Sequence, residues 1–233
     1  MNNTINCPNC NEDNPFYQSK CLKCNSFLRD KVANINLWET ISQLIESPVE
    51  AFSKIIRSEH KNFVAVILFF SSLKIFIDSI FLMMYVNKQA GVFDSIILQE
   101  AIILGILIIE VISISFIIKI VTGLFGLRTR LKDNFSILIY SLTPHALAIC
   151  ILFPIELVVF GTQLFSTNPS PFVLKETIAY IIFGIEGIII LWAIFLAAAA
   201  IYAQTRSLFF AIITGILFNG IILYSLYVLD TII

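Results

Sequence analysis

The chain has 233 residues, of which 58% are hydrophobic and only 13% charged, with a mean hydropathy of +0.90 and a formal net charge of −1. Soluble domains carry about 25% charged residues, so this composition excludes an ordinary soluble domain. The near-zero net charge also gives no reason to expect a nucleic acid as partner. Several windows exceed the roughly 18 apolar residues that mark a membrane helix. The composition therefore predicts an all-α polytopic membrane protein.

The first thirty residues are polar and contain no apolar run like the core of a signal peptide, so we expect no cleavable signal. Four of the five cysteines lie here, as the pairs Cys7-x-x-Cys10 and Cys21-x-x-Cys24. Each pair turns tightly and aims two thiolates at one point, and two pairs make the tetrahedral cage that zinc prefers. A segment this short has no core of its own, so the metal must supply its folding energy. Residues 1–30 are predicted to be a zinc ribbon.

Two alternatives use the same cysteines as redox-active dithiols or as disulfides, and a reducing compartment disfavours the disulfides. Four cysteine ligands close the coordination sphere, which predicts a structural zinc rather than a catalytic one. Asn9 and Asn25 stand where the two turns need a tolerant backbone. The fifth cysteine, Cys150, lies in an apolar run and is expected to be buried and inert.

Residues 34–61 are amphipathic and too polar to span a membrane. Apolar residues recur there at helical spacing, at Leu37, Ile41, Leu44 and Ile45. A second helix is predicted to begin at Ser47-Pro48, with Ser47 as N-cap, Pro48 at the first helical position and Glu50 completing a capping box. We expect two interfacial helices whose basic residues Lys54, Arg57 and Lys61 face anionic lipid headgroups. The alternative is a helix packed on the zinc ribbon.

Residues 62–233 are predicted to form a five-helix transmembrane bundle. The five spans are Phe63–Val86, Ala101–Val121, Phe135–Gly161, Ile178–Ala203 and Leu208–Leu229. The third contains Pro144 and Pro154, and a proline-broken span is tolerated only where protein or a wet cavity covers it. We therefore expect the third span to be central and packed inside the bundle. Small residues predict close helix packing at Gly184, Gly187, Ala197–Ala200, Gly215 and Gly220.

Basic residues are distributed unevenly between the loops, and this predicts orientation. With the N-terminus in the cytoplasm, the inner side holds twelve of them: Lys20, Lys23, Arg29, Lys31, Lys54, Arg57, Lys61, Lys119, Arg128, Arg130, Lys132 and Arg206. The outer side holds only Lys88 and Lys175. The split predicts a cytoplasmic N-terminus and an outside C-terminus.

Ionisable residues occur inside the predicted spans, at Lys74, Asp78, Glu110, His145, Glu156 and Glu186. A charge near mid-membrane costs at least about 2.5–3.5 kcal/mol on insertion scales, so these side chains should face the protein interior. Lys74 and Asp78 are four residues apart and can form an ion pair. Counted from the predicted span ends, the carboxylates are expected at a similar depth in the outer half of the membrane. The set is either a hydrated proton or cation site, or structural packing in which some carboxyls are protonated and hydrogen-bonded between helices.

The sequence contains no phosphate-binding loop, no HExxH motif and no serine elbow, so we expect no enzymatic activity. Ser141 and His145 share a helix face, but a serine–histidine pair on one membrane helix is weak support for catalysis.

The pre-membrane segment LIESPVEAFSKII, the five close-packed spans and the YSLTP segment at Tyr140–Pro144 resemble the Yip family over about residues 38–229. Prokaryotic members resemble this chain in placing a short zinc ribbon before the Yip domain. The resemblance implies a membrane protein without known enzymatic activity, and eukaryotic members act in vesicle traffic and bind Rab GTPases. The family's Asp-Leu-Tyr-Gly-Pro-like motif is not found here, so no GTPase-binding residue carries over. Pro48, Tyr140 and Pro144 carry over as positions that shape the fold.

The sequence thus favours a non-enzymatic membrane adaptor or organiser, in a prokaryotic cell membrane rather than the ER or Golgi, with an oligomer left open. Its partners would be the lipid bilayer and an unknown cytoplasmic protein bound by the zinc ribbon. The alternative is a small transporter or lipid-handling protein that uses the intramembrane polar cluster. Zinc ribbons fused to membrane helices also resemble paraquat-inducible-protein-A-like lipid transporters, whose repeated modules are absent here.

Overall fold

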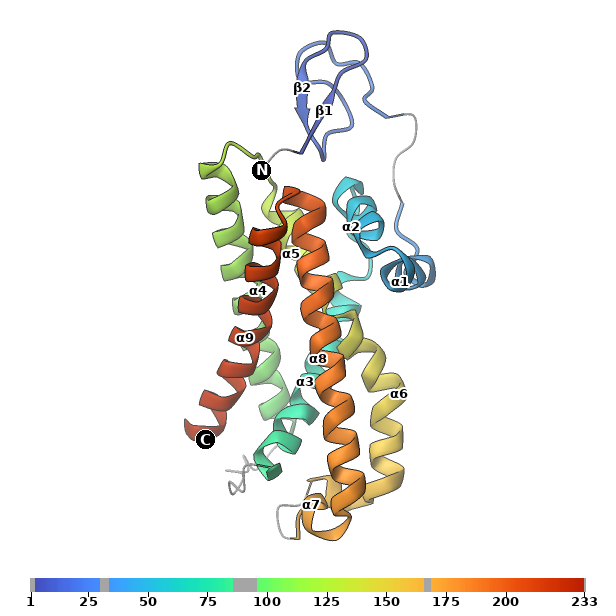
Figure 1. The fold of residues 1–233 in the computed structure, drawn as a ribbon, viewed down its shortest axis with the longest axis vertical. Coiled ribbons are helices and arrows are strands. Elements are labelled where there is room, and N and C mark those ends of the chain that lie inside the picture. Colours follow the sequence, from blue (N-terminus) through green and yellow to red (C-terminus); the bar gives the residue numbers. More distant parts are fainter. Residues whose placement is uncertain (1–2, 30–33, 86–95, 166–168, 233) are drawn as a thin grey trace. The chain divides into compact units, whose positions relative to one another are not determined.

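A computed structural model describes residues 3–29, 34–85, 96–165 and 169–232. The elements in chain order are β1 (Thr4–Asn6), β2 (Asp13–Pro15), α1 (Leu37–Glu46), α2 (Pro48–Arg57), α3 (Val64–Tyr85), α4 (Ile96–Leu124), α5 (Leu131–Ser141), α6 (Thr143–Phe160), the 3₁₀ helix η1 (Gly161–Phe165), α7 (Pro171–Leu174), α8 (Glu176–Thr205) and α9 (Leu208–Ile232) (Figure 1). Lys31, Lys88, Asn168 and the predicted end of the first span at Val86 lie outside the described residues.

Among the described residues, five helical stretches are long and apolar enough to cross a bilayer, which confirms the all-α polytopic prediction. They are Val64–Leu82, Ile97–Leu124, Leu131–Phe165, Glu176–Thr205 and Leu208–Leu229. Large apolar side chains on them are exposed, for example Ile109 at 66% and Val158 at 87%. Lipid is the solvent that such a surface requires. The second span begins before the predicted Ala101, and the third extends beyond both predicted ends.

The third span is two helices. α5 ends at Ser141 and α6 begins at Thr143, because Pro144 has no N–H for the carbonyl four residues earlier. Pro154 is instead accommodated inside α6. The third span was expected to be central and packed inside the bundle, but only 33% of its apolar window is buried, against 56% for Val64–Leu82. α5 is buried along most of its length, whereas α6 exposes one side.

The chain divides into two compact units. The first comprises Met1–Ala65, Val111–Ser141 and Phe195–Phe218, and the second comprises Val66–Glu110, Leu142–Ile194 and Asn219–Ile233. The cysteine-rich head and the two short helices α1 and α2 belong to the first unit.

In the first unit, α1 is capped by Asn36, whose side chain accepts from the N–H groups of Trp38 and Glu39. α2 begins at Pro48 as predicted, but the capping box is wrong. The Ser47 side chain makes no cap hydrogen bond, and the Ser47 carbonyl accepts from the Glu50 N–H instead. α2 packs against α5 through a buried apolar face that includes Phe52.

The basic residues of this segment have partners within the protein. Lys54 pairs with Glu39 at 2.5 Å, and Lys61 Nζ lies 2.9 Å from Asp133 Oδ1. The Arg57 guanidinium lies over the Phe16 ring of the head, 5.4 Å from its centroid. α1 nevertheless leaves Trp38 76% exposed. The segment thus contacts the head, as in the alternative, and an interfacial position stays a prediction.

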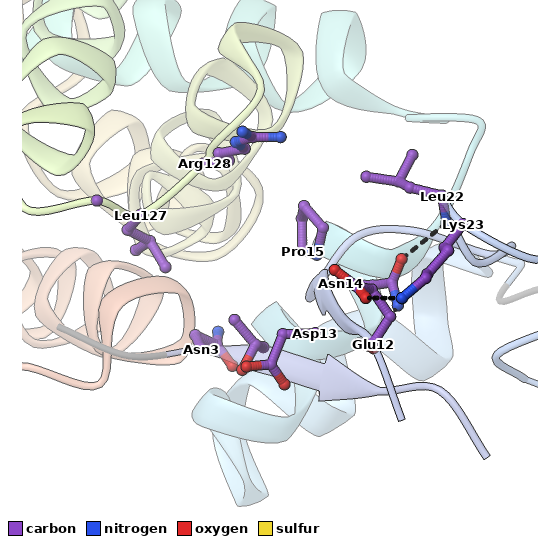
Figure 2. Close-up of a pocket in the computed structure, with 11 residues that line it drawn as sticks. Asn3, Glu12, Asp13, Asn14, Pro15, Leu22, Lys23, Leu127 and Arg128 are labelled. Carbon is purple, nitrogen blue, oxygen red and sulfur yellow. Dashed lines mark hydrogen bonds and ion pairs between the residues drawn. The ribbon is translucent and has the colours of Figure 1, made fainter. Parts of the chain in front are cut away.

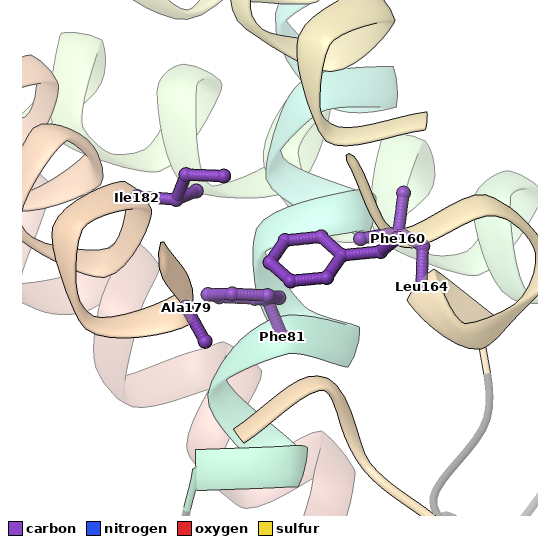
Figure 3. Packing of buried hydrophobic residues seen from close by; sticks show 5 residues of the cluster. All are labelled: Phe81, Phe160, Leu164, Ala179 and Ile182. Carbon is purple, nitrogen blue, oxygen red and sulfur yellow. The ribbon is translucent and has the colours of Figure 1, made fainter. Parts of the chain in front are cut away.

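The second unit has an aromatic core formed by Phe81, Phe160, Leu164, Ala179 and Ile182 (Figure 3). Phe172 joins it, with its ring centroid 4.9 Å from that of Phe81. The glycines do not bring helices together as expected: a Cβ at Gly184, Gly187 or Gly220 would meet nothing within 4 Å. The alanines of the predicted set, such as Ala197 and Ala200 of α8 in the first unit, are buried as expected.

Candidate functional sites: a cysteine cage and a buried charge cluster

The four cysteines of the head converge. The Sγ atoms of Cys7, Cys10, Cys21 and Cys24 all lie within 4.8 Å of one another. The Sγ atoms of Cys7 and Cys24 are 3.5 Å apart, and those of Cys10 and Cys21 are 3.6 Å apart. A tetrahedral site with metal–sulfur bonds of about 2.3 Å needs sulfur–sulfur edges of about 3.8 Å. All four thiols are free, so they fit a metal cage and form no disulfide.

The two turns that carry the cysteines have the same backbone geometry. The Asn11 N–H donates to the Cys7 carbonyl at 2.9 Å, and the Asn25 N–H donates to the Cys21 carbonyl at 3.0 Å. Asn11 and Asn25 have φ of 56° and 58°, a left-handed conformation that asparagine tolerates. The tolerant position is therefore the residue directly after each pair, so Asn25 was predicted correctly and Asn9 was not.

Neighbouring side chains support the cage. The Ser26 hydroxyl lies 3.0 Å from Cys24 Sγ and 3.1 Å from Cys7 Sγ, and its hydrogen bond lowers the pKa of the Cys24 thiol to about 6. The pKa of Cys10 is raised to about 12 despite a hydrogen bond from the Glu12 backbone, because burial and the neighbouring cysteines oppose its ionisation. A bound cation would relieve this repulsion among thiolates.

The head is anchored to the helices of its own unit. The Asn3 side-chain amide donates to the carbonyls of Ala203 and Gln204 at 3.0 and 2.9 Å. These carbonyls lie in the last turn of α8, where carbonyl groups have no N–H partner within the helix. The Arg130 guanidinium lies over the Tyr17 ring at 4.3 Å. These contacts could not be predicted from the sequence, although the aromatic pair Phe16-Tyr17 stands in the spacer between the cysteine pairs.

An open pocket of about 560 Å³ lies between the head and the loop from α4 to α5 (Figure 2). Pro15, Leu22 and Lys23 line it from the head, and Leu127 and Arg128 line it from the loop. Leu22 is 58% exposed there. We call it the head groove.

The second site is centred on Lys74 of α3, whose side chain is fully buried. Its Nζ lies 2.7 Å from Asp78 Oδ1 and donates to Glu156 Oε1 of α6 at 3.0 Å. It also donates to Glu186 Oε1 of α8. The predicted Lys74–Asp78 pair is present, but the lysine serves three carboxylates from three helices of the second unit.

His145 of α6 completes this charge cluster. Its Nδ1 lies 3.8 Å from Asp78 Oδ2, beyond hydrogen-bonding distance. Asp78, His145 and Asn219 line a cavity of about 30 Å³ together with apolar residues of α3, α8 and α9. A cavity of at least about 10–15 Å³ with polar walls can hold one water molecule.

Glu110 was predicted to share the layer of these carboxylates, but it lines a different, narrow pocket with Ser225. Its role as a member of the intramembrane polar cluster is therefore not supported by its position. Glu100, placed before the second span by the sequence pattern, lies within α4 and accepts a 2.7 Å hydrogen bond from Ser72.

Sequence reasoning missed a second buried ionic group, in the first unit. The Asp133 side chain has no exposed surface and contacts both Lys61 and Arg130, the latter through Nε at 2.7 Å. Next to it in sequence, buried Asn134 donates to the Ser115 carbonyl and accepts from Gln204. The sequence feature that could have indicated this group is the polar pair Asp133-Asn134 at the start of an apolar run.

Comparisons with known proteins give no relative: no protein-family model matches the chain, and neither the curated proteins nor the solved structures contain a match.

Proposed function

We propose that the protein is a non-enzymatic, Yip-like membrane adaptor whose zinc-binding head recruits a cytoplasmic protein. The observation that supports it best is the head groove. A head held by four thiols and fixed to the helices presents an open pocket of about 560 Å³ with Leu22 exposed in it. Apolar surface that a small folded head leaves open, rimmed by charges, is typical of an interaction site.

Zinc is the metal proposed for the cage. Four thiolates in a tetrahedral arrangement suit zinc, and they leave no open position for a substrate, so the metal's role is structural. The head is the part of the chain that a cytoplasmic partner would meet, because the positive-inside distribution predicts a cytoplasmic N-terminus and an outside C-terminus.

The groove offers charges of both signs at its rim. Lys23 donates to Glu12 at 3.1 Å, so this pair is already satisfied. Arg128 on the loop side lines the same pocket. A partner segment that places an apolar residue against Leu22 and a carboxylate near Arg128 would complement this surface.

The test is co-purification of the tagged full-length protein with cytoplasmic proteins from crosslinked cells. The substitutions Leu22→Asp and Arg128→Glu should each remove the same partner, because they alter opposite walls of the groove. Val173→Asp, a 74% exposed position on α7 in the other unit, is the matched control and should retain it. A partner captured equally by all four proteins would refute recruitment by the groove.

A second function, transport, is supported by the charge cluster of α3, α6 and α8. Buried charges in a membrane protein commonly mark an ion or substrate path. Proton or cargo flux into reconstituted vesicles that is lost in Glu156→Gln and Glu186→Gln but kept in Glu110→Gln would support it. Equal flux in all of these proteins would refute it.

A further inference from the structure

The charge cluster does not balance. Lys74 carries one positive charge, while Asp78, Glu156 and Glu186 carry three negative charges when ionised. The sum is −2 in a group whose members all lie within membrane-spanning stretches. Unbalanced charge buried in a low-dielectric interior is so costly that the group neutralises itself instead.

Several polar side-chain atoms of this cluster have no hydrogen-bond partner in the part of the chain that the structure describes. Glu156 Oε2, Glu186 Oε2 and His145 Nδ1 are buried and make no hydrogen bond among the described residues. The three side chains are 2%, 6% and 6% exposed. Each glutamate places one oxygen, Oε1, against the same Lys74 ammonium, so the two carboxyl groups meet at one cation. Two adjacent carboxyls cannot both ionise cheaply and share a proton.

We propose that the charge cluster is a proton-binding site that holds two exchangeable protons. One is shared by Glu156 and Glu186 beside Lys74, and the other is carried by the His145 imidazole facing Asp78. With both bound, the charges sum to zero: three carboxyls share one proton and leave −2, and the lysine and the imidazolium supply +2. The proposal goes beyond the adaptor function and concerns binding alone, so it stands whether or not protons cross the membrane.

A proton fits this site better than a metal cation. The Lys74 ammonium already occupies the point at which the three carboxylates converge. A metal ion would have to share that space with a like charge, and hard cations need six or more oxygens. The polar cavity of about 30 Å³ beside Asp78 and His145 has room for a water molecule that can carry a proton to the imidazole.

The titratable groups that face the site come from three helices: Lys74 and Asp78 on α3, His145 and Glu156 on α6, and Glu186 on α8. From α9, Asn219 contributes a neutral polar side chain to the cavity. On α4, Glu110 lines another pocket with Ser225, and Glu100 accepts a hydrogen bond from Ser72. The charge balance therefore depends on five ionisable residues.

The test measures the infrared band of protonated carboxyl groups in the full-length protein in lipid vesicles at neutral pH. In the wild type, the band should contain a component equivalent to one protonated carboxyl of the cluster, and isotope labelling should assign this component to glutamate. Glu186→Gln should abolish it. Lys74→Gln removes a positive charge, so one more proton must bind and the component should grow about twofold. The double variant Lys74→Gln/Glu186→Gln restores the charge sum and should return to the wild-type level.

Glu110→Gln is the matched control: it removes an intramembrane carboxyl outside the cluster and should leave the cluster component unchanged. If Glu186→Gln fails to fold, Glu156→Gln makes the same test, because it removes the other carboxyl that shares the proton beside Lys74. Absence of any glutamate component sensitive to Glu186→Gln would overturn the proposal. So would loss of the wild-type component on adding sodium or potassium at constant pH, which would identify a metal-cation site.

Discussion

Removal of Asp133 should destabilise the first unit strongly, because it strands a buried lysine. Asp133 and Lys61 have exposed side-chain fractions of 0% and 6%, and their charged atoms are 2.9 Å apart. Breaking a buried ion pair by removing one partner costs about 3–5 kcal/mol, whereas replacing both partners by apolar residues is often neutral or stabilising by about 1–4 kcal/mol. Asp133→Leu should therefore be worse than Lys61→Met/Asp133→Leu by at least about 3 kcal/mol.

Arg130, the third residue of this ionic group, changes the expected loss of stability little. Arg130 donates to Asp133 through Nε at 2.7 Å, but its side chain is 36% exposed and also lies over the Tyr17 ring. A half-exposed guanidinium that loses its carboxylate regains water, so most of the cost arises from Lys61. The matched control is Lys54–Glu39, a pair of the same segment in which Glu39 is 53% exposed. Breaking that pair should cost about 0–1 kcal/mol.

The assay is unfolding of the full-length protein in mixed micelles, followed at several pH values. Burial lowers the pKa of Lys61 below its ordinary 10.5 even beside Asp133. The unfolded chain therefore holds more protons between the folded pKa and 10.5, and stability should rise with pH through that window. Asp133→Leu should widen the window downward, so its destabilisation should shrink at alkaline pH. Equal stability of the single and double variants would refute the reasoning.

Three further predictions follow from the same structure. Metal analysis should find one zinc per chain in the wild type and none in Cys7→Ser/Cys21→Ser, because two of four ligands are gone; unchanged metal content would exclude the cage. A reporter fused after Ile233 should be accessible only from outside the cell, and cytoplasmic activity would contradict five spans with a cytoplasmic N-terminus. Cys150 is exposed on α6, so in detergent a maleimide should label it, while the four head cysteines should react slowly if they hold the proposed metal; an unlabelled Cys150 would contradict its exposure.

The spans and the convergence of the four head cysteines could be predicted because each signal is local in the sequence. Apolar length marks a span, and the two cysteine pairs specify their own turns. The Lys74–Asp78 pair was also local, at four residues' separation. The partners Glu156 and Glu186 lie 82 and 112 residues from Lys74, and no pattern in one sequence links them.

Burial inside the spans was the least predictable property. In a soluble domain an apolar run predicts a buried residue, but here lipid solvates apolar side chains, so Cys150 in such a run is exposed and its predicted burial is wrong. For the same reason, composition alone could not predict that α6 is more exposed than α5. Glu110 was grouped with the other carboxylates because similar depth was inferred from span ends, whereas helix rotation decides which side chains meet.

The most direct test of the adaptor function is photo-crosslinking in living cells from a benzoylphenylalanine placed at Leu22, inside the head groove. The proposal predicts a covalent adduct with a cytoplasmic protein, lost when Cys7→Ser/Cys21→Ser removes the metal cage that shapes the groove. The same probe at Val173, exposed on α7, should not capture that protein. Adducts from position 22 that contain only lipid or this chain itself, or that persist without the cage, would contradict a zinc-organised head that recruits a partner.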